Sequence, residues 1–163
     1  MTSELSQVED VLWAACDTLL WFHTNPWELD EALVGAGFLV GPLEVQDHVG
    51  LLYVLKRRNA YRSPVLPRMV AEGRIGKIGG VGFYRYPGGG GAVIDPLMED
   101  LILEEAHFAK VTRTPMSDAE IVHSVLTPVS VFLREKATDP IAVARQLQIN
   151  VDDLTDLLAQ TAS

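Results

Sequence analysis

Apolar residues recur every three or four positions over most of this chain, the spacing that places them on one face of an α-helix. The clearest case is residues 8–22, where the recurring positions are Val8, Val11, Leu12, Ala15, Leu19 and Phe22. No segment alternates apolar and polar residues for long enough to predict a β-sheet, although residues 81–86 could pair briefly as an extended strip. The pattern therefore predicts an all-α fold.

Capping signals and helix breakers divide this pattern into separate helices. The predicted helices are 8–22, 26–36, 42–59, 64–72, 96–109, 117–135, one that begins at Asp139-Pro140, and 154–160. Asn25 and Glu28 are expected to cap the second helix, and Ser117 with Glu120 forms a capping box. Residues 74–91 contain eight glycines, so a regular helix is excluded there.

Length and composition describe an ordinary globular chain. Its 163 residues fit one domain or two very small ones, and 48% of them are hydrophobic, which is enough to build a core. No run of 18 apolar residues occurs, and residues 1–10 lack the basic start of a targeting signal. The single cysteine, Cys16, excludes an intrachain disulfide, so we expect a buried, inert thiol and a cytoplasmic location.

Charge is distributed unevenly along the chain. The net charge of −9 argues against nucleic-acid binding, which needs a basic surface. Residues 1–55 contain no Lys or Arg, whereas residues 56–85, here called the basic segment, hold eight of the thirteen and only one acid, Glu72. In an otherwise acidic protein, such a segment predicts an anion site or one half of a complementary charge contact. The alternative is a solvated helix face.

Two groups of positions carry a resemblance to a known family. The first group is Asp30, Gly37, Phe38, Gly41, Pro42, Glu44, Asp47, Gly50 and Leu51. The second is Gly73, Arg74, Ile75, Gly76, Lys77, Gly79, Gly82, Phe83, Tyr84 and Tyr86. In order and spacing they resemble the helical C-terminal domain of 3-hydroxyacyl-CoA dehydrogenases, a fold of the 6-phosphogluconate/3-hydroxyacyl-CoA dehydrogenase C-terminal type. The resemblance implies an all-α domain built of two half-repeats.

The second half of the chain extends the resemblance. Residues 86–89, Asp95-Pro96 and residues 117–122 resemble the linker and second helical repeat of the multifunctional fatty-oxidation enzyme. We therefore expect residues 1–88 to form a first helical repeat. Residues 89–163 would form a linker and a shortened, degenerate second repeat.

The resemblance also implies a domain that covers one side of an acyl-CoA cleft and contributes to a homodimer interface. Several family positions differ here. The family's Asn-Arg pair has no counterpart in residues 8–16, and the family's polar positions in the second repeat hold Ser124 and Val131-Phe132. The catalytic His-Glu pair and the NAD fingerprint belong to a Rossmann domain that no part of this sequence matches. We therefore predict no catalytic residue, no metal, and no cofactor, with NAD involved only if a separate subunit supplies it.

Two functions remain open from the sequence. The first is a 3-hydroxyacyl-CoA dehydrogenase-like protein of fatty-acid metabolism that binds acyl-CoA or joins a separately encoded dehydrogenase subunit, without hydride transfer on its own. In that case Arg68, Arg74 and Lys77 are expected to face the ligand. The second is an oligomerisation or interaction module that has lost the ligand site. A helix-turn-helix regulator formed by residues 141–154 and the last helix is disfavoured, because that helix carries aspartates and no basic residue.

Other candidate sites have simpler structural explanations. The glycines of residues 35–41 resemble a dinucleotide-binding motif, but they end a predicted helix where that motif follows a strand. Backbone amides of residues 74–91 could form an anion-binding nest, although the aromatic residues there more simply anchor the loop. Asp47 beside His48 could serve acid–base chemistry, yet we expect Asp47 to brace the loop.

Overall fold

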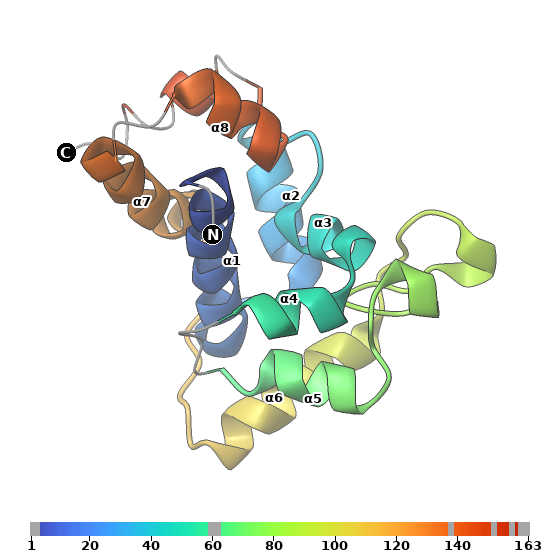
Figure 1. Cartoon of the computed structure of the whole chain (residues 1–163). Coiled ribbons are helices and arrows are strands. Elements are labelled where there is room, and N and C mark those ends of the chain that lie inside the picture. The colour runs from blue at the N-terminus through green and yellow to red at the C-terminus, as the bar shows by residue number, and fades with distance from the viewer. Residues whose placement is uncertain (1–3, 59–62, 137–138, 151–152, 157–158, 160–163) are drawn as a thin grey trace.

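The computed structural model describes residues 4–58, 63–136, 139–150, 153–156 and 159. Helices dominate these ranges, and β-pairing within them is limited to isolated bridges, which confirms the all-α prediction. The α-helices are α1 (Glu4–Phe22), α2 (Pro26–Gly35), α3 (Pro42–Val49), α4 (Leu51–Arg57), α5 (Val65–Ala71), α6 (Pro96–Phe108), α7 (Asp118–Lys136) and α8 (Pro140–Leu147) (Figure 1). Two short 3₁₀ turns, η1 (Lys77–Gly79) and η2 (Pro87–Gly89), interrupt the glycine-rich loop.

The predicted capping residues lie where the helices begin. The side chain of Asn25 accepts a hydrogen bond from Glu28 N at 3.0 Å. Ser117 and Glu120 exchange two bonds of 3.2 Å, the reciprocal pattern of a capping box. Of the predicted last helix, residues 154–156 and 159 are helical, and 157–158 and 160 lie outside the described residues.

The prediction of one helix over residues 42–59 was wrong. Gly50 adopts a φ of 104°, which ends α3 and allows α4 to begin in a new direction. The released amide of Leu51 donates to the carbonyl of Ile75 at 2.9 Å. The break therefore serves a contact with the distant glycine-rich loop, which the local pattern could not indicate.

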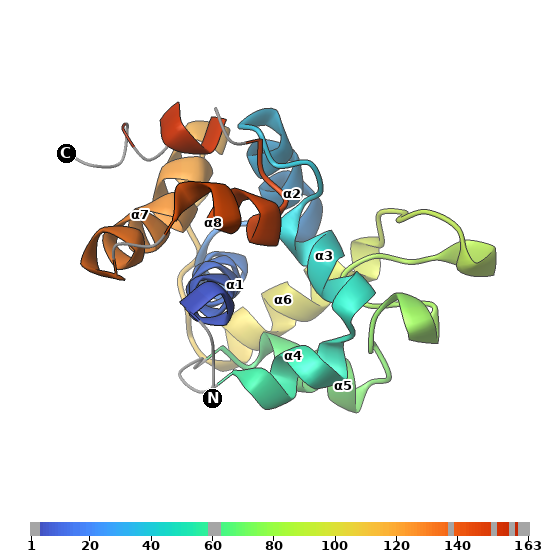
Figure 2. The same cartoon turned by 45° about the horizontal axis from the view of Figure 1, so that its top comes forward.

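Helix α1 lies in the middle of the molecule, surrounded by other helices (Figure 2). Its most extensive contact is with α7, and the two helices bury apolar side chains such as Leu12, Cys16 and Val125. Burial raises the pKa of the Cys16 thiol, so the expected inert thiol is what the core contains. One apolar cluster includes residues of both predicted repeats, so a continuous core crosses the boundary at residues 88–89.

None of the described helices combines the length and the apolar character that crossing a membrane requires.

Candidate functional site

Asp47 of α3 holds the glycine-rich loop against the helices. Its buried carboxylate accepts hydrogen bonds from the backbone amides of Phe83 at 2.9 Å and Tyr84 at 3.1 Å. The Tyr86 hydroxyl donates a third bond of 2.6 Å to the same carboxylate. The loop passes so close that a Cβ on Gly76 would stand 2.5 Å from the Asp47 carbonyl oxygen. The prediction that Asp47 braces the loop is confirmed.

Asp30 of α2 performs the same task at the start of α3. Its carboxylate accepts from the backbone amides of Leu43 at 2.9 Å and Glu44 at 3.0 Å, two donors that the first turn of a helix leaves unpaired. The Tyr84 hydroxyl adds a bond of 2.8 Å. Gly41 lies against this carboxylate, so that a Cβ there would stand 2.6 Å from Oδ2 of Asp30. The hydrogen bonds of Asp30 and Asp47 thus form one buried network that links α2, α3 and the loop, here called the Asp30 frame.

Burial raises the pKa of Asp17 and of Asp30 to about 7, and that of Asp47 to about 6, from an ordinary value of 3.8. The folded protein therefore binds protons that the unfolded chain releases, and the stability these groups contribute is lost as pH rises through 6 to 7. We expect the free energy of unfolding in urea to fall by roughly 1 kcal/mol or more per pH unit between pH 5 and 7, and to level off by pH 8. Asp17→Asn should flatten this slope, whereas Asp100→Asn at an exposed site should leave it unchanged. An unfolding free energy that rises over this range would contradict the assignment.

Three guanidinium groups of the basic segment, those of Arg57, Arg68 and Arg74, form ion pairs with the chain's own acids. Arg57 contacts carboxylates of α1, Glu9 at 2.6 Å and Asp10 at 2.8 Å, and lies over the Trp13 ring at 4.7 Å. These contacts lie within the chain, whereas the sequence predicted a contact with a ligand or with the acidic surface of a partner, which stays a prediction. Arg62 lies outside the described residues.

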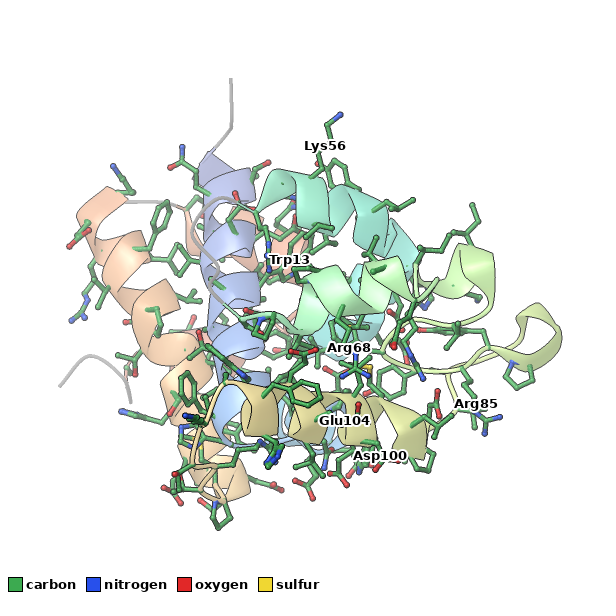
Figure 3. The ribbon with its side chains drawn as sticks, turned by 90° about the horizontal axis from the view of Figure 1, so that it is seen from below. Trp13, Lys56, Arg68, Arg85, Asp100 and Glu104 are labelled. Atoms are coloured by element: carbon green, nitrogen blue, oxygen red, sulfur yellow. The ribbon has the colours of Figure 1, made fainter. Side chains whose placement is uncertain are left out.

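The three residues expected to face a ligand occupy different surroundings. Arg68 of α5 pairs with acids of its own helix end and of α6, the nearest being Glu104 at 2.9 Å (Figure 3). Arg74 donates to the Gly82 carbonyl at 3.0 Å and to Asp95, the N-cap of α6, at 2.8 Å. Lys77 of η1 has its ammonium 5.9 Å from the Tyr86 ring centre. Arg68 and Arg74 therefore tie the loop and α5 to α6, and their contact with a ligand stays a prediction.

Asp47 and His48 do not act as a pair. Asp47 is buried against the loop, whereas the half-exposed His48 ring faces outward and lies 3.7 Å from Glu44. The acid–base alternative therefore has no supporting geometry. Among the residues that the structure describes, no group of three or more His, Cys, Asp or Glu side chains is placed to hold a metal ion.

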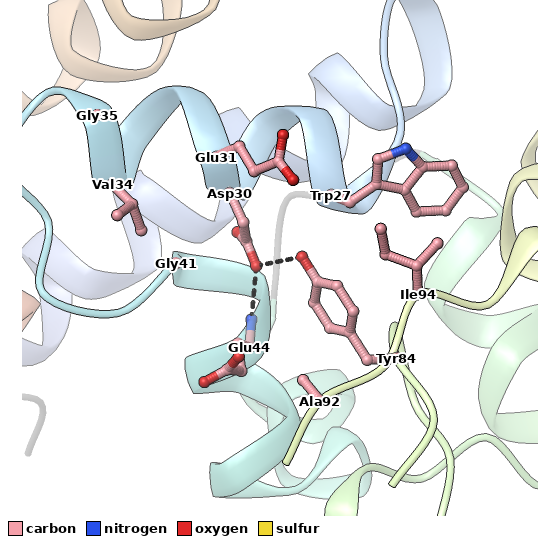
Figure 4. Close-up of a pocket in the computed structure, with 10 residues that line it drawn as sticks. All are labelled: Trp27, Asp30, Glu31, Val34, Gly35, Gly41, Glu44, Tyr84, Ala92 and Ile94. Carbon is pink, nitrogen blue, oxygen red and sulfur yellow. Dashed lines mark hydrogen bonds between the residues drawn. The ribbon is translucent and has the colours of Figure 1, made fainter.

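A pocket of about 500 Å³ adjoins the Asp30 frame, a size typical of small-molecule sites (Figure 4). Its lining residues are Trp27, Asp30, Glu31, Val34, Gly35, Gly41, Glu44, Tyr84, Ala92 and Ile94. None of the predicted ligand residues lines it. The sequence did carry a signal for one wall, because Trp27, Glu31 and Val34 are spaced by four and three and share one face of α2.

Comparison with known proteins places this frame in a family context. Residues 10–86 match the model of the 3-hydroxyacyl-CoA dehydrogenase C-terminal domain. This matched range includes both Asp30 and Asp47. This match confirms the resemblance predicted from the sequence.

Two relatives and one solved structure agree with that match. A probable 3-hydroxyacyl-CoA dehydrogenase of Caenorhabditis elegans is 35% identical over 71 residues, which is 36% of this chain and 24% of the relative. A peroxisomal fatty acid beta-oxidation multifunctional protein of Oryza sativa subsp. japonica is 28% identical over 116 residues, 63% of this chain and 16% of the relative. The dehydrogenase part of multifunctional enzyme 1 from C. elegans superposes on 97% of this chain with a TM-score of 0.67 and 21% identity, which shows a shared fold. The chain spans 36% of that structure, so it corresponds to a minor part of each of these proteins.

Proposed function

We propose that this chain acts in fatty-acid oxidation as the helical partner of a 3-hydroxyacyl-CoA dehydrogenase catalytic domain, and that it binds acyl-CoA without transferring hydride itself. The observation that carries the proposal is the match of residues 10–86 to the C-terminal domain of that family. The relatives named for this activity support it. NAD and the catalytic groups would come from a dehydrogenase region or subunit to which this chain is joined. A homodimer and the cytoplasmic location are further parts of the proposal.

Lys77 is the first residue to test for contact with the anionic parts of acyl-CoA. Arg68 and Arg74 already neutralise carboxylates of α6 and its N-cap, so a phosphate would have to compete with those acids. Lys77 makes no ion pair with another described residue and precedes the exposed residues 78–80 of the glycine-rich loop. Of the three residues expected to face a ligand, Lys77 therefore has the charge most readily offered to one.

Calorimetric titration with acetoacetyl-CoA should give saturable binding that weakens several-fold when the salt concentration rises from 50 to 300 mM, since phosphate contacts are screened. Lys77→Ala should weaken binding about tenfold at low salt. Lys136→Ala removes the same charge from the exposed end of α7 and should leave the affinity unchanged.

Absence of heat at either salt concentration, with a protein that still unfolds cooperatively, would overturn the acyl-CoA part of the proposal. Sedimentation of the same sample tests the homodimer, whose mass would be twice 17.9 kDa. A dimer without ligand binding would favour the second function, an interaction module that has lost the ligand site.

A further inference from the structure

The pocket beside Asp30 carries a chemical character that the proposed function does not use. Three of its lining residues are acids, namely Asp30, Glu31 and Glu44, and none is Lys, Arg or His. Carboxylates that face one space without a cation repel one another and each gains from a positive guest. An acyl-CoA, which is polyanionic, is therefore the wrong ligand for this pocket.

The carboxylates are not equally free to bind. Asp30 already accepts from two backbone amides and the Tyr84 hydroxyl, so it leaves little room for a bond to a ligand. Glu31 is exposed and makes no ion pair with another described residue, and the basic group that lies within ion-pair distance of Glu44 is His48, at 3.7 Å. In Figure 4 the Glu31 and Glu44 side chains lie on either side of the Asp30–Tyr84 hydrogen bond.

The rest of the lining is apolar and aromatic. Val34 lies on α2, while Ala92 and Ile94 come from the segment that returns from the glycine-rich loop. The Trp27 ring lies beside Ile94 at one end of the pocket (Figure 4). A tryptophan face attracts cations in addition to apolar groups. A ligand complementary to both the acidic and the apolar parts of the lining carries a positive charge at one end and a hydrocarbon chain along its length.

We propose that this pocket binds an alkylammonium group, with the nitrogen between Glu31 and Glu44 and the hydrocarbon arm against Trp27, Val34, Ala92 and Ile94. An ammonium carries a full positive charge and three donors, so both glutamates attract it and either can accept one of its hydrogen bonds. The same chemistry is presented by a free amine and by the side chain of a lysine. This inference does not depend on acyl-CoA binding, because the anionic ligand is expected elsewhere.

Chemical-shift titration of the full-length protein tests the proposal, with hexylammonium as the probe. Its addition should shift the amide signals of Glu31, Gly35 and Ala92 saturably, while hexan-1-ol and hexanoate, which have the same hydrocarbon arm, should bind at least tenfold more weakly. A capped lysine, Nα-acetyl-lysine N-methylamide, separates the two sources. Shifts with both probes would support a lysine of a protein, and shifts with hexylammonium alone would support a free amine.

The matched variants keep the size of each side chain. Glu31→Gln combined with Glu44→Gln should weaken hexylammonium binding at least tenfold. Asp100→Asn combined with Glu135→Gln removes the same net charge from exposed positions that do not line the pocket, and should leave binding unchanged. Equal binding of hexan-1-ol, shifts confined to residues away from the pocket, or an unaffected Glu31/Glu44 double variant would each overturn the proposal.

Discussion

Gly82→Ala is expected to destabilise the protein by at least about 3 kcal/mol, at the upper end of what overpacking a well-packed site costs. A Cβ at this position would overlap the Asp47 carboxylate, with Cγ only 2.7 Å away, and would stand 2.8 Å from the Cα of Gly76. The Gly76 neighbour is backbone, and the Asp47 carboxylate is held by three hydrogen-bond donors. Neither can therefore move aside without a substantial cost in free energy. Urea unfolding followed by circular dichroism measures the loss.

Gly91→Ala is the matched control for this substitution. It makes the same chemical change at the other end of the same loop, where nothing lies within 4 Å of the added Cβ and φ is not positive. Its effect should stay within about 0.5 kcal/mol. Equal destabilisation by the two variants would mean that the loop resists any added side chain, and the specific role of the Asp47 contact would be refuted.

Asp47→Ala should cost about 3–5 kcal/mol, because it leaves buried donors without an acceptor. The amides of Phe83 and Tyr84 cannot reach water in the folded state, and the Tyr86 hydroxyl loses its partner as well. The variant should also release the loop, which hydrogen exchange would detect as faster exchange of the Phe83 and Tyr84 amides.

Tyr86→Phe provides the graded comparison for Asp47→Ala. It removes one of the three donors and leaves both backbone bonds in place, so a loss of about 1 kcal/mol is expected with the two amides still protected. If Asp47→Ala cost no more than Tyr86→Phe, the carboxylate would not be the anchor of the loop.

The helices could be predicted because their information is local. In α1 and α7 the apolar period and the capping residues lie within the helix itself, so the sequence pattern is sufficient. For the break at Gly50 the glycine itself was a local signal, but the hydrogen bond from Leu51 to Ile75 that accompanies the break was not, because Ile75 follows α5 in the chain. Local sequence patterns indicate which secondary structures a segment can form, and contacts with distant residues determine which of these structures it adopts.

The candidate site was predictable only in part for the same reason. Asp47 could be assigned its bracing role from the resemblance, because the motif includes the loop that it holds. The charges of Arg68 and Arg74 were visible, but their partners on and before α6 are more than twenty residues away in the chain. The pocket joins one wall on α2 to a second wall around Ile94, and no sequence pattern relates those two segments.

The packing of α1 against α7 has a consequence for how the protein is made. The ribosome releases α1, which ends at Phe22, long before it synthesises α7, which begins at Asp118. Until then the apolar face of α1 lacks its largest partner, and the chain must stay soluble on its high negative charge. The core can therefore close only late in translation, so a nascent chain stopped before α7 would be a substrate for chaperones rather than a small folded domain.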